Sequence, residues 1–335
     1  MVLMKDVNVR FLNESEYEIW DEFVDASPQG NIFNKSYWLK HVCSNFDILV
    51  AESKNKIVAG IVLPYMKGKI YRNPKLTPQL GVLLEPRDPK QKYSTYLSRE
   101  IELSEELIKS FPKFNQFDYN FSYNYTNFMP FIWNDFNVNV RYTYVIEDLS
   151  DIDKVYSDFQ YDIKYQIKKA VKSNITVTDR YGIDEFYEIN KKTFDRQKMQ
   201  MPYTLELLKN IDEELAKRQK RKIFFAENNE GKIIAGVYII YDEKCAYYLM
   251  GGADPEYRNM GAQALTLWEA IKFSSTVSKQ FDFEGSMVRG IESAFRQYGG
   301  TQKIIYNVNK SNLYTKIAID FARKNKNWIR KVFKV

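Results

Sequence analysis

The feature that most constrains this chain is an internal repeat. Residues 48–61 read ILVAESKNKIVAGI and residues 224–237 read FFAENNEGKIIAGV, so both contain Ala-Glu, a polar turn and then Ile-Val/Ile-Ala-Gly. A second pair follows, FNQFDYNFS at 114–122 and SKQFDFEGS at 278–286. Fixed self-similarity of this length indicates a duplicated structural unit, and loop-length changes explain why the two offsets differ.

Each half of the repeat predicts the same order of elements. The first pair of matches reads as a β-hairpin, because β-branched residues flank Ser, Asn, Lys and Gly turn residues. An amphipathic stretch follows in each half, 93–110 and 260–275, and then come a further strand, a helix and a last strand. Residues 153–173 predict one helix that opens the second copy, since they contain neither Pro nor Gly. Interleaved strands and helices indicate an α/β or α+β class with a mixed sheet.

Length and composition fit two ordinary domains. The 335 residues suit two units of about 150 residues. We therefore expect an N-terminal domain over 1–150 and a C-terminal domain over 151–335. The N-terminus lacks the apolar run of a signal peptide, and no stretch reaches about 20 apolar residues, so we expect a cytoplasmic protein.

Histidine and cysteine are too scarce to carry the chemistry. The chain has one histidine, His41, and two cysteines, Cys43 and Cys245. A zinc site needs more ligands, and side chains at i and i+2 of a helix point apart, so we expect no metal and no histidine-based nucleophile. Catalysis should depend on carboxylates, Tyr, Lys, backbone amides or the substrate.

The order of these motifs resembles the GNAT acyltransferase fold, and its tandem form resembles the FemAB-like family with its BioF2-like acetyltransferase domain. Three stretches carry the resemblance: 27–31 running into Tyr37-Trp38-Leu39-Lys40, the basic segment 165–177, and Phe281-Asp282-Phe283-Glu284-Gly285-Ser286 with the later Tyr298-Gly299. The resemblance implies two tandem GNAT-like domains, with the acceptor held on the N-terminal side and the donor on the C-terminal side.

Substrate contacts follow from the same resemblance. In the Fem group a lysine on the first helix helps to hold a sugar nucleotide, and Lys40 falls at the matching place. Trp38 beside it and Arg289 after the FDFEGS stretch are further substrate-binding candidates. The group also has an arginine before a proline in its second domain, where this chain has Met201 before Pro202.

The FDFEGS stretch supplies the catalytic candidates. Asp282 and Glu284 stand at i and i+2, which puts both carboxylates on one face of a strand, and crowding of like charges would raise one pKa towards that of a general base. Both could instead be structural, accepting hydrogen bonds at the start of the next helix. Tyr248, on the strand 245–251, is a candidate acid for the leaving group or a packed strand residue.

A glycine loop precedes the second amphipathic stretch. GNAT enzymes bind the CoA pyrophosphate with an Arg/Gln-x-x-Gly-x-Gly/Ala loop at a helix start, and Arg258, Gly261 and Ala262 are the candidates here. Gln263 takes the last position of the pattern, so the match is half complete. The first copy has no glycine there and only one carboxylate, Asp118, which favours the second copy as the donor half.

Three functions stay open at this point. The first is transfer of an acyl or aminoacyl group to an amino group of a sugar nucleotide, glycan or cell-wall precursor, from acyl-CoA or aminoacyl-tRNA, without a tightly bound cofactor. The second is acetyl-CoA-dependent N-acetylation of another small amine. The third is non-catalytic binding of RNA or a membrane, favoured by a net charge of +6, the stripe Lys164-Lys168-Lys172 and the basic, aromatic tail 323–334.

Overall fold

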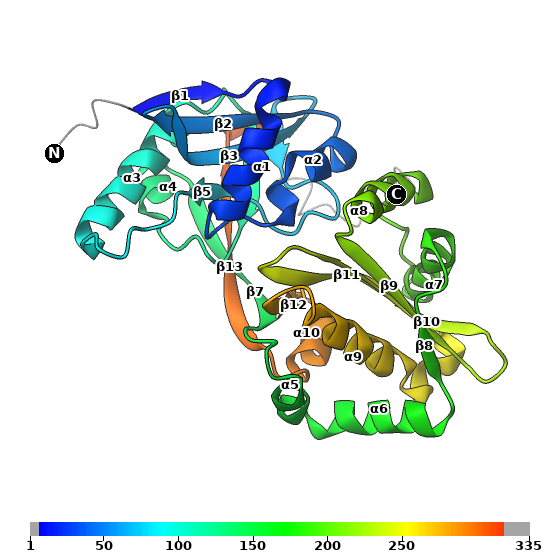
Figure 1. Ribbon diagram of the computed structural model, residues 1–335. Coiled ribbons are helices and arrows are strands. Elements are labelled where there is room, and N and C mark those ends of the chain that lie inside the picture. Colours follow the sequence, from blue (N-terminus) through cyan, green and yellow to red (C-terminus); the bar gives the residue numbers. More distant parts are fainter. Residues whose placement is uncertain (1–6, 318–335) are drawn as a thin grey trace. The chain divides into compact units, whose positions relative to one another are not determined.

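The computed structural model describes residues 7–317 of the chain. These residues form two compact units (Figure 1). The first contains the chain up to Val140 and takes it up again from Tyr306 on, and the second is Arg141–Ile305. The chain thus leaves the first unit once and returns to it.

A twisted sheet forms the first unit. Its strands are β1 (Val7–Phe11), β2 (Phe46–Ser53), β3 (Lys56–Met66), β4 (Ile70–Arg72), β5 (Val82–Leu84) and β6 (Gln116–Phe121), ordered β1-β2-β3-β4-β6 with β5 paired to β3. The helices are α1 (Tyr17–Ala26), α2 (Ser36–Val42), α3 (Tyr93–Lys109) and α4 (Met129–Trp133), with short 3-10 turns η1 (Glu14–Glu16) and η2 (Ile32–Asn34). Large aromatic side chains such as Trp20, Phe117 and Phe121 fill the core between these layers.

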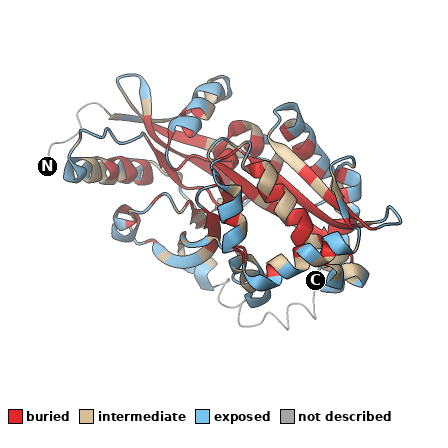
Figure 2. Cartoon of the chain, turned by 60° about the horizontal axis from the view of Figure 1, so that its bottom comes forward, coloured by how far each residue is buried: buried red, intermediate tan, exposed pale blue. Residues whose placement is uncertain are grey.

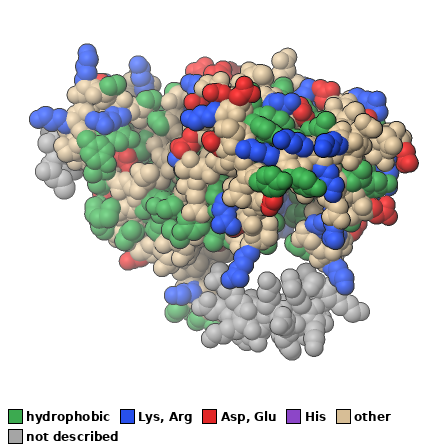
Figure 3. Space-filling view, turned by 90° about the horizontal axis from the view of Figure 1, so that it is seen from below, with side chains coloured by type: hydrophobic (Ala, Val, Ile, Leu, Met, Phe, Trp, Pro, Cys, Tyr) green, Lys and Arg blue, Asp and Glu red, His purple; other side chains and the backbone are tan. Residues whose placement is uncertain are grey.

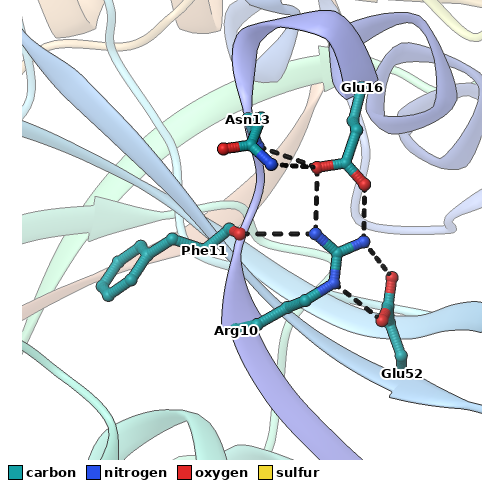
Figure 4. A network of polar contacts seen from close by, with 5 residues as sticks. All are labelled: Arg10, Phe11, Asn13, Glu16 and Glu52. Carbon is teal, nitrogen blue, oxygen red and sulfur yellow. Dashed lines mark hydrogen bonds and ion pairs between the residues drawn. The ribbon is translucent and has the colours of Figure 1, made fainter.

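A polar network fastens the edge strand β1 (Figure 4). The Arg10 guanidinium donates two hydrogen bonds to the Glu52 carboxylate on β2, at 2.8 and 2.9 Å. It donates two more to Glu16 on η1, at 2.6 and 2.9 Å. Glu16 also accepts from the backbone N–H of Asn13. One side chain therefore ties β1 both to the sheet and to the start of the first helix.

The second unit is a sheet covered on both faces. Its strands are β8 (Thr176–Thr178), β9 (Arg221–Glu227), β10 (Ile233–Tyr241), β11 (Cys245–Ala253) and β12 (Gln280–Asp282), in the order β12-β11-β10-β9-β8. Its helices are α5 (Ile152–Asp158), α6 (Tyr161–Lys172), α7 (Ile183–Arg196), α8 (Leu205–Lys217), α9 (Ala262–Ser274) and α10 (Arg289–Arg296), and η3 (Pro255–Met260) is a 3-10 turn.

Alternating side chains of β10 decide which helix covers which face. Ala235, Val237 and Ile239 join the core cluster that α6 and α9 cover, whereas Gly236 and Tyr238 face Phe186 on α7. Figure 1 shows α9 and α6 on one side of these strands and α7 on the other. In Figure 2 the strands and the inward helix faces are buried and the outward helix faces exposed, as expected for amphipathic helices on a sheet.

The two units exchange their last strands. β7 (Asn137–Ile146) comes at the end of the first sequence copy, yet Val145 and Ile146 pair with β12 in the second unit. β13 (Thr301–Ser311) ends the second copy, yet Tyr306–Ser311 pairs antiparallel with β6 in the first unit. Both crossings of the chain lie inside strands. The repeat predicts a boundary at residue 150. The two compact units instead meet after Val140 and after Ile305, because the chain crosses between them within β7 and β13.

Several local predictions are confirmed by the structure. The two repeat segments form the hairpins β2–β3 and β9–β10. The turn of the first hairpin uses Lys54 and Asn55, both with positive φ, and that of the second uses Gly231. The amphipathic stretches 93–110 and 260–275 contain α3 and α9. The mixed α/β class is confirmed as well.

The single helix predicted over 153–173 is wrong. The segment forms α5 and α6, separated by extended backbone at Phe159 and Gln160. The buried Phe159 ring packs edge-on against Trp268 and Tyr298, and the Gln160 N–H donates to the Gln297 carbonyl at 2.9 Å. Tertiary contacts therefore override a locally good helix sequence.

The remaining surface features are ordinary. No helix within residues 7–317 is long and apolar enough to cross a membrane. Lys168 and Lys172 of the predicted stripe are exposed, whereas Lys164 Nζ donates to the Ser157 carbonyl. On the face shown in Figure 3, basic side chains alternate with acidic and hydrophobic ones. The basic tail 323–334 lies outside the described residues.

The Arg10 network predicts a pH-dependent stability. Hydrogen bonding to Arg10 lowers the pKa of Glu16 from its ordinary 4.5 to about 2. A depressed carboxyl pKa stabilises the fold above 4.5, and this contribution disappears as the pH falls towards 2. We expect Glu16→Gln to unfold at a lower temperature than wild type at pH 7, with the difference shrinking below pH 4.5.

The measurement is thermal unfolding followed by circular dichroism across this pH range. Glu18→Gln is the matched control, because Glu18 is exposed on α1 outside the network. A difference between Glu16→Gln and wild type that does not change with pH would contradict the assignment.

Candidate active site

Two neighbouring strands of the second unit diverge. β11 and β12 are parallel and stay in register only from Cys245–Tyr247 opposite Gln280–Asp282. β12 ends at Asp282, whereas β11 continues to Ala253. Beyond Tyr247, therefore, β11 still pairs with β10 on one side, but no residue of β12 pairs with it on the other side.

The unpaired part of β11 also contains a β-bulge. Tyr238 on β10 is opposite Met250 and Ile239 is opposite Tyr248, so Leu249 has no partner in β10. A bulge of this kind redirects backbone groups away from the ladder. A free edge beside a bulge is a place where we expect unpaired backbone N–H groups, of the type that can receive a developing oxyanion.

The end of β12 is held by buried hydrogen bonds. Asp282 is fully buried, and its Oδ1 accepts from the Thr143 hydroxyl of β7 at 2.6 Å and from the Glu284 N–H at 2.8 Å. The Phe283 N–H donates to the Tyr144 carbonyl at 3.0 Å. Asp282 therefore has a structural role, because its hydrogen bonds hold the turn that follows β12. This geometry also corrects the sequence argument, because Glu284 lies beyond the strand and has a positive φ of 56°.

Glu284 is the unusual carboxyl of this turn. Its Oε1 is sealed from solvent and has no hydrogen-bond partner among the described residues. Burial, followed by the nearby charge of Asp282, raises the pKa of Glu284 well above its ordinary value. A carboxyl with a raised pKa is a stronger base near neutral pH, and a buried polar atom without a partner is a group that a substrate can satisfy.

Tyr248 lies on the diverging edge of β11. Gln263 of α9 donates a hydrogen bond to its hydroxyl oxygen at 3.3 Å, and its ring packs on Phe295 of α10. Gly251 leaves the space for this hydroxyl, since a Cβ there would come within 1.8 Å of it. Burial raises the pKa of Tyr248, so the hydroxyl stays protonated and can donate a proton or a hydrogen bond.

The glycine loop forms the start of α9. Arg258 is exposed on η3 and has neither a hydrogen bond nor an ion pair within the described chain. Gly261 has φ of +77°, and a Cβ there would approach the Gln166 carbonyl of α6 to 2.1 Å. Ala262 is the buried first residue of α9. No side chain caps α9, so the N–H groups of its first turn are available to an anion.

The substrate-binding candidates have different surroundings. Trp38 is fully buried in the first unit, where its indole N–H donates to Thr77, so it is a core residue there. Lys40 is exposed on α2, paired with Glu14 at 2.7 Å and lying over the Tyr17 ring. Arg289 is exposed at the first position of α10 in the second unit.

Sequence reasoning missed two supporting residues. Asn190 of α7 is buried, donates to the Gly251 carbonyl at 2.7 Å and accepts from the Tyr203 hydroxyl at 2.7 Å. Gln263, which counted only as a mismatch in the loop pattern, holds Tyr248. Asn190 could have been noticed in the sequence, because it is an Asn on the apolar face of an amphipathic helix, beside Phe186 and Ile189.

No cluster of three or more His, Cys, Asp or Glu side chains suited to a metal occurs in residues 7–317. The groups that the site does present are a buried carboxyl, a tyrosine hydroxyl, backbone amides and a helix start.

Comparison with known proteins identifies the fold. Residues 157–284 match the model of the acetyltransferase (GNAT) domain. No curated protein matches the chain. The crystal structure of FemX superposes with a TM-score of 0.66 at 13% identity, over 90% of this chain and 96% of FemX.

Two further structures are similar over nearly their whole length. L-PGS from Bacillus licheniformis gives a TM-score of 0.54 at 12% identity, covering 92% of this chain and 95% of L-PGS. A tandem GNAT protein from the clavulanic acid biosynthesis pathway gives 0.52 at 10% identity, covering 90% and 98%. The tandem GNAT fold that the resemblance implied is thus confirmed.

The contact between Gly261 and α6 predicts a stability effect. Gly261→Ala should lower the free energy of unfolding by more than the roughly 1–3 kcal/mol of a strained backbone, because the new Cβ also strikes the Gln166 carbonyl. Gly231→Ala is the matched control, since Gly231 has φ of +76° and nothing within 4 Å.

Urea unfolding of both variants measures the difference. If Gly261→Ala and Gly231→Ala lose the same amount of stability, backbone strain alone explains the loss, and the contact with the Gln166 carbonyl contributes nothing.

Proposed function

We propose that this chain, an acyltransferase of the GNAT fold with FemAB-like tandem architecture, transfers an acyl or aminoacyl group to an amino group of a sugar nucleotide, glycan or cell-wall precursor. The observation that carries the proposal is the unpartnered carboxyl of Glu284 at the point where β11 and β12 diverge within the GNAT domain.

The donor would lie along the free edge of β11. Its carbonyl oxygen would accept from a backbone N–H near the bulge at Leu249. Its phosphates would face the uncapped start of α9 and the unpaired Arg258. Acyl-CoA and aminoacyl-tRNA both combine a reactive carbonyl with phosphates, so the site suits either donor.

Glu284 and Tyr248 would divide the proton transfers. The ionised Glu284 takes a proton from the acceptor ammonium, and the free amine attacks the donor carbonyl to form a C–N bond. The C–S bond of a thioester, or the C–O bond of an ester, then breaks. Tyr248 is protonated at neutral pH and gives its proton to the leaving sulfur or oxygen. The nitrogen of the new amide loses its remaining extra proton, which returns to the Tyr248 oxygen.

The acceptor class rests on Lys40 and on the structural neighbours. Lys40 is an exposed cation whose partner Glu14 is also exposed, so an acceptor phosphate can replace that partner. FemX and a lysylphosphatidylglycerol synthetase are among the structures with this fold, which supports a cell-envelope acceptor. Met201 before Pro202, in place of the Fem arginine, favours a glycan or sugar nucleotide over a peptidoglycan precursor.

The second candidate is acetyl-CoA-dependent N-acetylation of another small amine. The match of residues 157–284 to the acetyltransferase domain favours it, together with Arg258 and Gly261 at the helix start. Both candidates use the same donor half and differ in the acceptor.

Glu284→Gln tests the catalytic base. We expect turnover to fall by about 10²- to 10⁴-fold, the usual contribution of a general base, with donor binding unchanged. In wild type, turnover should rise as the pH passes upward through the raised pKa of Glu284, because only the ionised carboxyl accepts a proton. That rise should be absent from the variant.

Glu269→Gln serves as its control, since Glu269 lies on α9 and pairs with Lys272. Wild-type turnover in Glu284→Gln, with acyl-CoA or aminoacyl-tRNA as donor, would remove Glu284 from the mechanism.

Arg258→Ala tests the donor site. We expect acetyl-CoA to bind about tenfold more weakly than to wild type, as loss of one charged hydrogen bond predicts. Titration calorimetry measures the affinity. Arg218→Ala is the control, because Arg218 is at the end of α8 and pairs with Glu214.

The absence of any binding heat with wild-type protein would exclude acetyl-CoA as donor and leave aminoacyl-tRNA to be tested in the same way. Equal affinity in wild type and Arg258→Ala would remove Arg258 from the donor site.

A further inference from the structure

The free edge of β11 gains new partners before the strand ends. The Asp254 N–H, just after β11, donates to the Ile234 carbonyl of β10 at 2.9 Å. Backbone groups of successive residues in a strand point alternately to its two sides, so Gly252 also faces β10, whereas Gly251 and Ala253 face the free edge. These two residues lie beyond the part of β11 that pairs with β12.

The partners of this edge are side chains of α7. Asn190 Nδ2 donates to the Gly251 carbonyl at 2.7 Å, and Thr193 Oγ1 accepts from the Ala253 N–H at 3.2 Å. A helix thus satisfies a carbonyl and an N–H that a neighbouring strand would otherwise satisfy. On this side β11 exchanges its partner, from β12 in its first residues to α7 in its last ones.

Two opposed glycines allow α7 to approach the strand so closely. Gly252 of β11 is paired with Gly236 of β10. A Cβ at Gly252 would come within 2.5 Å of Asn190 Cα, and a Cβ at Gly236 would come within 3.0 Å of Ile189 Cγ2. Glycine within a strand often marks a close approach of another backbone. Here it places the α7 backbone against β11, so that the short Asn190 side chain reaches the edge.

The amide of Asn190 has only one possible orientation. A carbonyl oxygen cannot donate, so the amide nitrogen must face Gly251, and the amide oxygen accepts from the Tyr203 hydroxyl at 2.7 Å. Asn190 and Tyr203 are both buried. Burial also raises the pKa of Tyr203, so its hydroxyl keeps the proton that it donates. Tyr203 therefore holds Asn190 in the orientation that Gly251 requires.

The two partners leave one short stretch of the edge between them. This stretch is Tyr248–Met250, which includes the bulge residue Leu249. In the proposed transfer, N–H groups of this stretch receive the donor's carbonyl oxygen, and they stabilise its developing charge only if their direction is fixed beforehand. Pairing with β12 holds one end of the stretch, and the hydrogen bond from Asn190 holds the other.

We propose that Asn190, oriented by Tyr203, is a positioning residue of the transfer, because it holds the Gly251 carbonyl and so directs the N–H groups of Tyr248–Met250 at the donor carbonyl. This inference rests on the proposed function. Asn190 acts through the backbone of β11 and does not touch the reacting atoms.

Tyr203→Phe tests the proposal with the ring kept in place. With a donor that the wild type uses, we expect kcat to fall about tenfold, less than for loss of an oxyanion donor itself, and KM for the donor to stay unchanged. The rise of turnover with pH that Glu284 confers should remain. Tyr238→Phe is the matched control with wild-type kcat, because it also removes a buried hydroxyl, one that donates to Asp212 of α8 at 3.0 Å.

Amide hydrogen exchange of the free protein separates positioning from overall stability. Asn190→Leu should speed exchange in peptides from Tyr248–Ala253 by about fivefold, the effect of losing one buried hydrogen bond, and leave exchange in β9 unchanged. Exchange that becomes equally faster throughout the second unit would show that Asn190 only stabilises the fold and would overturn the proposal.

Failure of this inference is distinguishable from failure of the proposed function. A wild type that transfers nothing from acyl-CoA or aminoacyl-tRNA contradicts the proposed function and this inference with it. An active wild type, with Tyr203→Phe losing no more kcat than Tyr238→Phe, overturns the role of Asn190 alone and leaves Glu284 in the mechanism.

Discussion

The pairing of β7 with β12 is the interaction on which the candidate active site depends. β12 is only three residues long, and it turns sharply at Glu284 and Gly285. Without a second neighbour this short strand would be a sheet edge free to fray. β7 supplies the Thr143 hydroxyl for Asp282 and the Tyr144 carbonyl for the Phe283 N–H, which fixes the direction in which Glu284 leaves the strand.

The exchange of β7 and β13 makes the two copies of the duplicated chain depend on each other. Because β7 comes from the first sequence copy and β13 from the second, neither unit has its full sheet without the other copy's last strand. The two copies are therefore bound together by hydrogen-bonded strands and not only by a linker. Loss of either copy would remove a strand from the sheet that remains, so the duplication is difficult to reverse once the strands have exchanged.

Much of the fold could be predicted from local patterns. The hairpins follow from alternating β-branched residues and turn residues, and α3 and α9 follow from apolar spacing. The strand exchange could not be predicted, because pairing of β6 with β13 joins residues far apart in sequence. The tight fit at Gly261 was equally hidden, since the sequence showed a phosphate-loop glycine but not the α6 carbonyl beside it.

The candidate site, like the fold, could be predicted only in part from the sequence. The FDFEGS stretch pointed to Glu284 and Asp282, but only the turn geometry separates the carboxyl that shapes the backbone from the one left without a partner. Asn190 was invisible because a buried amide in a helix looks like any polar residue until the carbonyl it contacts is known. Residue types in the sequence suggested the kind of chemistry. Burial and hydrogen-bond partners in the structure then distinguished the roles of Asp282 and Glu284.

The start of the central helix shows how the two copies have come to differ. In the second unit, η3 and Gly261, with its positive φ, lead into α9. In the first unit, the loop between β5 and α3 has no glycine, and the same position of the fold holds a cavity with Glu100 at its wall. The two copies of the repeated fold thus differ at the start of the helix that follows their central strands, although both keep the strands and the helix themselves.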